Sequence, residues 1–159
     1  EAEFERAVRG DDGRRFPWGD DSPSHDLTVY STDSTEDVGA HPDGRGPYGH
    51  DDLAGNVWEW MEDYYDPFAY VRPTADVGEP GSCEDILETQ DQLRRDHRQG
   101  FTGTNPIPTE CEHAIRGGAY NYGADGLRAS NRVHHPAHFR IPMLGFRCAW
   151  DPTIQPVAD

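Results

Sequence analysis

Residues 55–60 read Gly-Asn-Val-Trp-Glu-Trp, and this stretch decides the fold that we expect. Side chains alternate across an extended strand, so both tryptophan rings can be buried on one face while Glu59 points the other way. A buried carboxylate needs a partner, because an unpaired charge in apolar surroundings is prohibitive. The residues alone leave two partners open: an arginine of the C-terminal part, or a hard cation that Glu59 binds together with loop carbonyls.

The sequence around this stretch predicts few and short regular elements. Apolar residues at helical spacing over residues 4–8 predict a helix that Gly10 ends. Residues 11–50 are rich in Gly, Pro and Asp and predict loop, with one stretch, Leu27–Tyr30, that can form a strand. Three further strand-like runs are Ala114–Arg116, Gly126–Asn131 and Leu144–Trp150.

One complete helix is predicted at Cys83–Gln99. Ser82 is a suitable N-cap and Gly100 a suitable C′ residue, with acidic side chains in the first turns and arginines in the last. Cys83 and Cys111 bracket this helix. A disulfide between them and two free thiols are nearly equal alternatives, and a disulfide would favour an exported protein in an oxidising compartment.

The charge is strongly acidic and unevenly spread. The chain of 159 residues carries a formal net charge of −16, and its 14 basic residues are all arginine. Residues 113–159 contain 3 acidic residues and 5 arginines, so the acidic excess lies before them. This balance excludes a nucleic-acid binder or a binder of anionic membranes, since both need a basic surface. No run of about 18 apolar residues is present, so no transmembrane segment is expected.

Two glycine-containing motifs follow in the C-terminal part, Arg116-Gly117-Gly118-Ala119-Tyr120 and Gly145-Phe146-Arg147-Cys148-Ala149-Trp150. Paired glycines allow close approach of backbones or positive φ, and each arginine can clamp a carboxylate with two hydrogen bonds. We expect the large apolar side chains of these motifs and of the first stretch to be buried: Trp58, Trp60, Phe146 and Trp150.

The order GNVWEW, RGGAY, LRASNR and GFRCAW resembles the formylglycine-generating enzyme family, also called sulfatase-modifying factor. The resemblance implies an α+β, C-type-lectin-like fold with short antiparallel strands, few helices and much irregular loop. It also implies that residues 1–159 form a single domain, the C-terminal part of a family domain whose N-terminal part is missing. Residues 73–110 would then be an inserted, helix-containing segment.

The resemblance does not extend to the catalytic cysteines. Family members that oxidise a sulfatase cysteine share two copper-binding cysteines, five residues apart, after the RGG motif. Counted from Arg116, these positions hold Tyr122 and Leu127. Neither side chain suits Cu(I), which favours thiolates. We therefore expect no copper, no formylglycine-generating activity and no catalytic residues of that kind.

The resemblance does imply a structural Ca²⁺ site. By position, its ligands would be Glu59, the carbonyls of Gly55 and Val57, and a contribution from Asp52. The histidine tract from His134 to His138 invites a zinc site instead, but Pro136 breaks its spacing and flanking arginines repel cations. Loop histidines without a metal are the favoured interpretation there.

The mildly basic C-terminal part is the expected ligand surface. Its side chains are the Tyr, Asn, His and Arg types found in adaptable binding sites. The residues are Tyr120, Tyr122, Asn131, His134, His135, His138, Phe139 and Arg140. The sequence thus favours a non-catalytic ligand- or protein-binding module of this family. The alternative is the substrate-shaping C-terminal domain of an oxidative enzyme, either an iron-dependent sulfoxide synthase or a formylglycine-generating oxidase with an atypical site.

Overall fold

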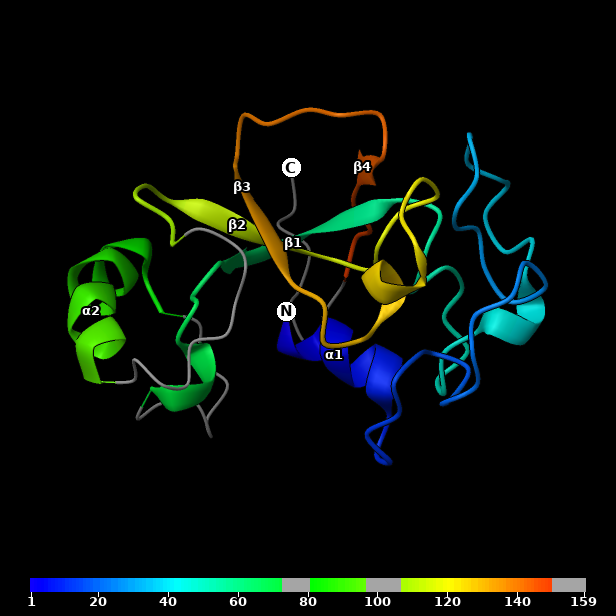
Figure 1. Cartoon of the computed structure of the whole chain (residues 1–159), viewed down its shortest axis with the longest axis horizontal. Coiled ribbons are helices and arrows are strands. Elements are labelled where there is room, and N and C mark those ends of the chain that lie inside the picture. The colour runs from blue at the N-terminus through cyan, green and yellow to red at the C-terminus, as the bar shows by residue number, and fades with distance from the viewer. Residues whose placement is uncertain (73–80, 97–106, 150–159) are drawn as a thin grey trace, which may run out of the picture.

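The structure is a computed structural model that describes residues 1–72, 81–96 and 107–149. Within these ranges a four-stranded sheet is accompanied by two α-helices, which confirms the α+β class (Figure 1). The strands are Trp58–Tyr64 (β1), Glu112–Arg116 (β2), Val133–Pro136 (β3) and Leu144–Gly145 (β4). Their spatial order is β3-β2-β1-β4, so β3 and β4 form opposite edges of the sheet.

The central strand β1 pairs antiparallel with β2, and β2 pairs antiparallel with β3. The contact between β1 and β4 is parallel, which corrects the expectation of antiparallel strands alone. Because side chains alternate along β1, Trp58 and Trp60 lie on one face and Glu59 and Met61 on the other. Trp58 is 2% exposed and packs with Ile115 of β2, while Trp60 is only partly buried.

Helix α1 (Ala2–Arg9) covers the opposite face of the sheet and lies below it in Figure 1. Phe4 and Val8, four residues apart on one side of the helix, are buried together with Leu53 and Met61. The helix ends at Gly10, whose φ of +56° is a conformation that favours glycine. The predicted first helix and its end are therefore confirmed.

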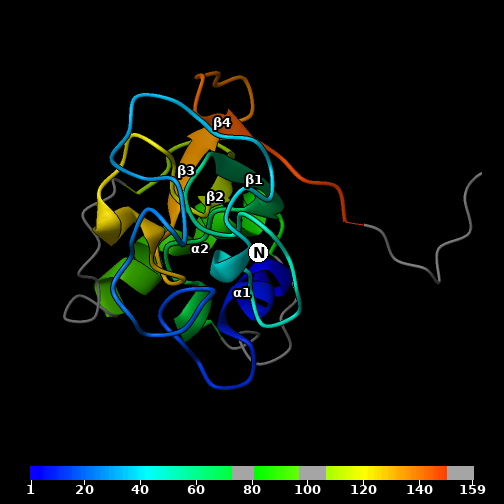
Figure 2. The same cartoon turned by 90° about the vertical axis from the view of Figure 1, so that its right-hand side faces the viewer.

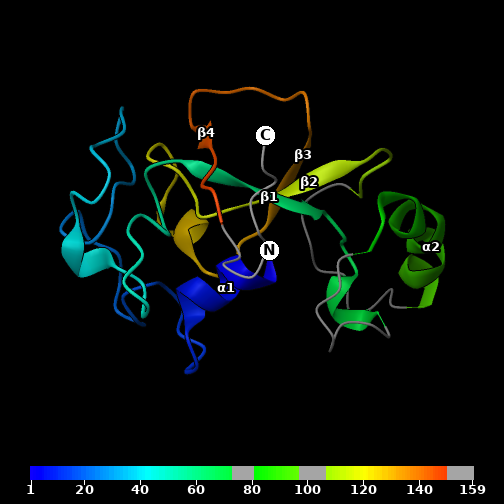
Figure 3. The same cartoon turned by 180° about the vertical axis from the view of Figure 1, so that it is seen from behind.

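Helix α2 (Cys83–Asp96) and the irregular residues 11–50 lie at opposite ends of the sheet (Figures 1 and 3). The hydroxyl of Ser82 accepts a hydrogen bond from the Asp85 backbone N–H at 3.2 Å, so the predicted N-cap is confirmed. The helix is assigned to Asp96, and the predicted residues up to Gln99 and the C′ residue Gly100 lie outside the described residues. A disulfide joins Cys83 to Cys111, and Cys148 is exposed and unpaired.

Residues 11–57 pass beside the sheet as an irregular segment, seen on the near side in Figure 2. The structure shows no strand at Leu27–Tyr30, which corrects that expectation. Thr28 and Val29 are nevertheless buried, and the Val29 carbonyl accepts a hydrogen bond from the Asn56 N–H at 3.0 Å. This single backbone hydrogen bond, to another loop, does not make the repeated pattern of hydrogen bonds that defines a strand.

Two other strand predictions need correction. Residues 124–127 form a short 3₁₀ helix, and the chain is irregular from Arg128 to Arg132, so no strand forms at 126–131. The Asn131 side-chain amide closes this turn by donating to the Gly126 carbonyl at 2.9 Å. The last strand is only Leu144–Gly145, because the residues after it turn away from the ladder, and Trp150 lies outside the described residues.

None of the helices in the described part of the chain is long and apolar enough to cross a membrane.

Candidate functional site

The connection between β3 and β4 crosses from one edge of the sheet to the other and lines one side of an open cavity of about 490 Å³. In Figure 1 this connection is the orange arch above the sheet. Trp60 of β1 and His113 of β2 form the floor, and Ala137 and Arg140 of the arch contribute from above. The remaining lining residues are Met61, Leu144, Gly145 and Phe146.

The floor of the cavity is aromatic. The rings of Trp60 and His113 meet edge to face with centroids 6.2 Å apart, and Tyr64 lies 4.7 Å from the same imidazole. His113 Nδ1 lies 3.0 Å from the carbonyl oxygen of Glu62. Since a carbonyl can only accept, Nδ1 carries the proton, and a neutral His113 keeps its acceptor lone pair on Nε2.

Among the described residues that line this cavity, Arg140 is the one charged side chain. Its Nη1 donates to the carbonyls of Ala137 and Phe139, both at 2.7 Å. These two hydrogen bonds fix the guanidinium against the backbone of the β3–β4 connection, which we call the arch. No Asp or Glu is found among the lining residues that the structure describes, although the chain as a whole carries a charge of −16. An arginine among aromatic and apolar walls suits an organic anion with an apolar body.

The structure brings three of the predicted ligand residues to this region. Arg140 lines the cavity, and His135 and Phe139 stack on each other with centroids 3.7 Å apart. His135 lies directly opposite His113 across β2 and β3. Burial lowers the pKa of His135 from its ordinary value, with a smaller opposing effect from Glu112.

The neighbouring histidine faces the other side of the sheet. His134 is 8% exposed, its Nδ1 lies 2.6 Å from Glu112 Oε2, and its ring stacks on Tyr65. His134 and His135 belong to strand β3, which corrects their assignment to a loop. Among the described residues, no three His, Cys, Asp or Glu side chains gather into a group that could hold a metal.

The other predicted ligand residues lie elsewhere. Tyr122 is partly exposed and meets the buried Trp58 edge to face at 5.2 Å. The Tyr120 N–H donates to the Asn56 carbonyl at 2.9 Å, and Asn131 closes the turn described above. His138 is exposed on the arch. The predicted set is therefore divided between the cavity, the turn before β3 and the opposite face of the sheet.

Sequence reasoning missed Trp60, His113 and Phe146 as lining residues. Phe146 was expected in the core but is 75% exposed, which corrects that expectation. Alternation along the chain explains this: Arg147 points toward Glu59, so Phe146 points to the opposite side. The same alternation along β1 places Trp60 on the face that carries His113, and this signal was available in the sequence.

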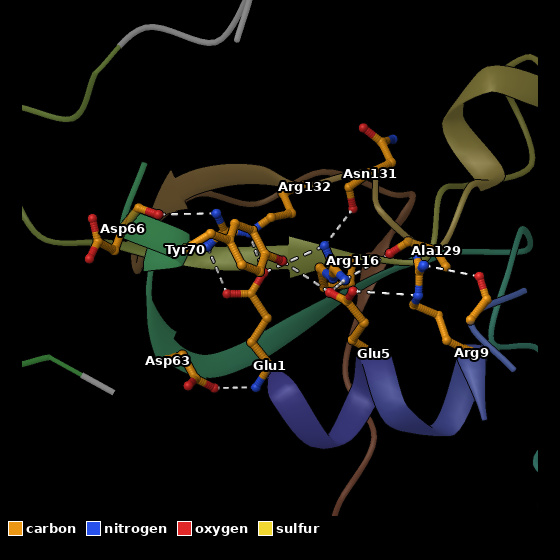
Figure 4. Close-up of polar contacts among 11 residues, drawn as sticks. Glu1, Glu5, Arg9, Asp63, Asp66, Tyr70, Arg116, Ala129, Asn131 and Arg132 are labelled. Atoms are coloured by element: carbon orange, nitrogen blue, oxygen red, sulfur yellow. Dashed lines mark hydrogen bonds and ion pairs between the residues drawn. The ribbon is translucent and has the colours of Figure 1, made fainter. Parts of the chain in front are cut away.

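The opposite face of the sheet holds a buried network of ion pairs under α1 (Figure 4). Arg116 is fully buried, and its guanidinium donates to Glu5 Oε2 and to the Ala129 carbonyl, both at 2.7 Å. Arg132 binds the two carboxylate oxygens of Glu1 at 2.6 and 2.9 Å. The contacts with Glu1 and Glu5 fasten the start of α1 to the sheet, and the contact with Ala129 binds β2 to the turn before β3.

A second cavity, of about 440 Å³, lies beside this network. Its lining includes Arg132, whose pKa is raised because the bonds and charge of Glu1 outweigh the effect of burial. It also includes Arg72, which binds Asp66, and Tyr70, which donates to Glu5 at 3.1 Å. The acids and arginines of this wall bind one another, so we assign them a structural role.

Glu59 is paired with Arg147. The carboxylate is 4% exposed, and it receives Arg147 Nε on Oε2 at 2.6 Å and Nη2 on Oε1. The same guanidinium donates to the carbonyls of Asp51 and Asp52 at 3.1 and 3.2 Å. Of the two partners that the residues left open for Glu59, the structure shows the arginine, and Ca²⁺ binding at this place stays a prediction.

Residues 1–152 match the sulfatase-modifying factor enzyme 1-like domain, the FGE-sulfatase family. The chain belongs to this family. This confirms the resemblance read from the GNVWEW, RGGAY and GFRCAW motifs. Of the two positions that the motif resemblance matches to the family's cysteines, Leu127 is buried against Phe16 and Ala54, and Tyr122 is the exposed ring beside Trp58.

The chain is similar in sequence to two curated proteins and in fold to one solved structure, as follows. The chain is 32% identical over 158 residues to hercynine oxygenase of Mycolicibacterium thermoresistibile, covering 95% of this chain and 31% of that protein. It is 28% identical over 172 residues to formylglycine-generating enzyme of Streptomyces coelicolor, covering 95% and 45%. PvdO from Pseudomonas aeruginosa shares the fold, with a TM-score of 0.56, 21% identity, and coverage of 91% and 48%. The chain thus spans less than half the length of each.

Proposed function

We propose that this chain is the ligand-binding part of a larger family protein, and that it shapes a substrate site without supplying the redox centre. The arch cavity is the proposed binding site, and its ligand is a small organic anion with an aromatic or apolar body. The observation that carries the proposal is the position of Arg140, which in the described part of the chain is the one charged group in an aromatic and apolar lining.

Two further observations support a binding role over a copper-dependent one. Tyr122 and Leu127 occupy the positions of the family's copper-binding cysteines, and neither offers a thiolate. The similarity to hercynine oxygenase covers only about a third of that protein. We therefore propose that the redox centre, in a protein of the hercynine oxygenase kind, would be supplied by other parts of the molecule.

The proposal is tested by ligand binding. 3-Phenylpropionate is the first probe, since it is an anion with an aromatic ring. Hercynine is the second probe: it carries a carboxylate and an imidazole ring but also a trimethylammonium cation, so it tests whether the site accepts a zwitterion. Titration by calorimetry should give saturable binding of 3-phenylpropionate. Arg140→Gln should weaken it by roughly 10-fold or more, because a charge-assisted hydrogen bond contributes about 1.5–3 kcal/mol.

Arg128→Gln is the matched control, since Arg128 is an exposed arginine paired with Asp125 outside the cavity. It should leave affinity unchanged. An equal loss of affinity in both variants would mean that the anion is attracted by the overall charge of the protein and does not occupy the arch cavity. Saturable binding that is insensitive to Arg140 would contradict the assignment of the site.

A further inference from the structure

The imidazole of His113 is held in one orientation in the floor of the arch cavity. The pairing of β1 with β2 is irregular between Trp60 and Tyr64, and the Glu62 carbonyl lies within this irregular stretch. His113 Nδ1 lies 3.0 Å from that carbonyl oxygen. The Tyr64 ring lies against the same imidazole, and the Trp60 ring meets it edge to face. Strand β1 thus fixes the imidazole by one backbone contact and two aromatic contacts.

This contact decides what His113 can offer to a ligand. The Glu62 carbonyl can only accept a hydrogen bond, so His113 Nδ1 is the donor between them. In a neutral imidazole the other nitrogen, Nε2, then keeps its lone pair and accepts. The two nitrogens of the five-membered ring point in nearly opposite directions, so Nε2 is directed away from the β1 backbone. Because His113 lines the cavity, Nε2 is the polar atom that it can offer to a ligand there.

The other polar side chains of the lining are donors. Arg140 and the indole N–H of Trp60 can only donate, and the remaining lining residues carry apolar side chains or none. Within the described lining, His113 Nε2 is therefore the one side-chain nitrogen or oxygen atom that can accept a hydrogen bond. A ligand that uses this atom must bring a donor in addition to its anionic group. A site with such an acceptor discriminates against ligands that lack the donor, because its acceptor is then left unpaired.

We propose that His113 determines the specificity of the arch cavity, and that the ligand is an aromatic carboxylate that also carries a phenolic hydroxyl group. The inference rests on the proposed function, because the carboxylate must bind Arg140. The hydroxyl group donates to His113 Nε2, and the aromatic ring lies between the apolar walls that include Trp60 and Phe146. A phenol suits the site better than an ammonium group, since a second cation would be repelled by the Arg140 guanidinium.

The test compares matched ligands by calorimetry at mildly alkaline pH, where a histidine side chain is neutral. The ligands are 3-phenylpropionate, its 3-hydroxyphenyl and 4-hydroxyphenyl analogues, and the two corresponding methoxy compounds, which keep the oxygen atom but lose the donor. At least one hydroxylated acid should bind wild type roughly 2- to 10-fold more tightly than 3-phenylpropionate, the range of one net hydrogen bond. Its methoxy counterpart should show no such gain.

His113→Phe should remove this preference and keep an affinity for 3-phenylpropionate close to that of wild type. His25→Phe is the matched control and should retain the preference. His25 also stacks on a tyrosine, Tyr30, but is not among the lining residues. A preference for the hydroxylated acid that survives in His113→Phe would overturn the proposal.

Nitrogen-15 NMR of the wild-type protein adds a measurement that a purely structural role of His113 would not affect. The hydroxylated acid should shift the signal of the unprotonated Nε2 in a saturable manner, because this atom accepts the new hydrogen bond, and the methoxy compound should not. If His113→Phe binds none of the acids, this signal decides: a shift with the hydroxylated acid alone supports the proposal, and no shift overturns it.

The inference and the proposed function fail separately. Binding of 3-phenylpropionate that depends on Arg140, without a gain from either hydroxyl group, would leave the proposed function standing and overturn the role of His113. Absence of saturable binding by all five acids would overturn both.

Discussion

At the residue scale, two arginines of the sequence motifs form ion pairs with glutamates. Arg116 binds Glu5 under α1, and Arg147 binds Glu59 at the edge of the sheet. The two differ in burial, because Arg116 is fully buried and Arg147 keeps 38% of its side chain exposed. Buried pairs are costly to break, since removal of one partner leaves an uncompensated charge behind.

Arg116→Met should therefore lower the free energy of unfolding by about 3–5 kcal/mol. The change removes the donors for Glu5 and for the carbonyls of Ala129 and Asn131, while a methionine keeps much of the apolar volume. Arg128→Met, at an exposed pair, should cost less than about 1 kcal/mol. Urea unfolding of both variants measures the difference, and equal costs would show that the network under α1 is not important for stability.

His135 provides a pH-dependent prediction. Its pKa is lowered by burial, so the folded state resists a proton that the unfolded state accepts. The stability from neutral His135 is therefore present above its ordinary value of 6.5 and is lost as the pH falls through the lower, folded pKa. His135→Gln should reduce the fall in melting temperature between neutral and acidic pH, whereas the exposed His50→Gln should not. A pH profile identical in His135→Gln and wild type would contradict this.

At the scale of elements, the Cys83–Cys111 disulfide joins the start of α2 to the start of β2. The intervening loop is long, with a sequence separation of 28, so the loop-entropy model gives a stabilisation of about 3–4 kcal/mol. The double variant Cys83→Ser/Cys111→Ser should lose about this amount in urea unfolding, and Cys148→Ser should lose nothing. If reduction leaves the wild-type melting temperature unchanged, the disulfide does not stabilise the fold.

The elements also show what the sequence could predict. The helix at Phe4 and Val8 and the cap at Ser82 were predictable, because local spacing and hydrogen bonding produce them. Strand β3 was missed, since Val133–Pro136 has no alternation of apolar and polar residues and owes its extended form to pairing with β2. Residues 126–131 were predicted to form a strand, but they contain no β-branched or aromatic residue, and the Asn131 amide closes them into a turn.

At the scale of the whole molecule, the two faces of the sheet have different roles. The face under α1 holds the buried ion pairs and the larger apolar cluster, and it stabilises the fold. The face under the β3–β4 arch holds Trp60, His113 and the arch cavity. The sequence predicted the arch residues Phe139 and Arg140 but not the cavity floor, because the floor is formed by strands distant in sequence.

The central claim is that the arch cavity binds an aromatic anion, and the tryptophan side chains test it in the wild-type protein. Trp60 lies in the cavity floor, whereas the Trp18 indole N–H donates to the Asp21 carbonyl at 3.1 Å and is not part of the lining. In ¹⁵N-resolved NMR, titration with the aromatic anion 3-phenylpropionate should shift the indole signal of Trp60 in a saturable manner and leave that of Trp18 unchanged. Saturation with no movement of the Trp60 signal would place the ligand elsewhere and contradict the account.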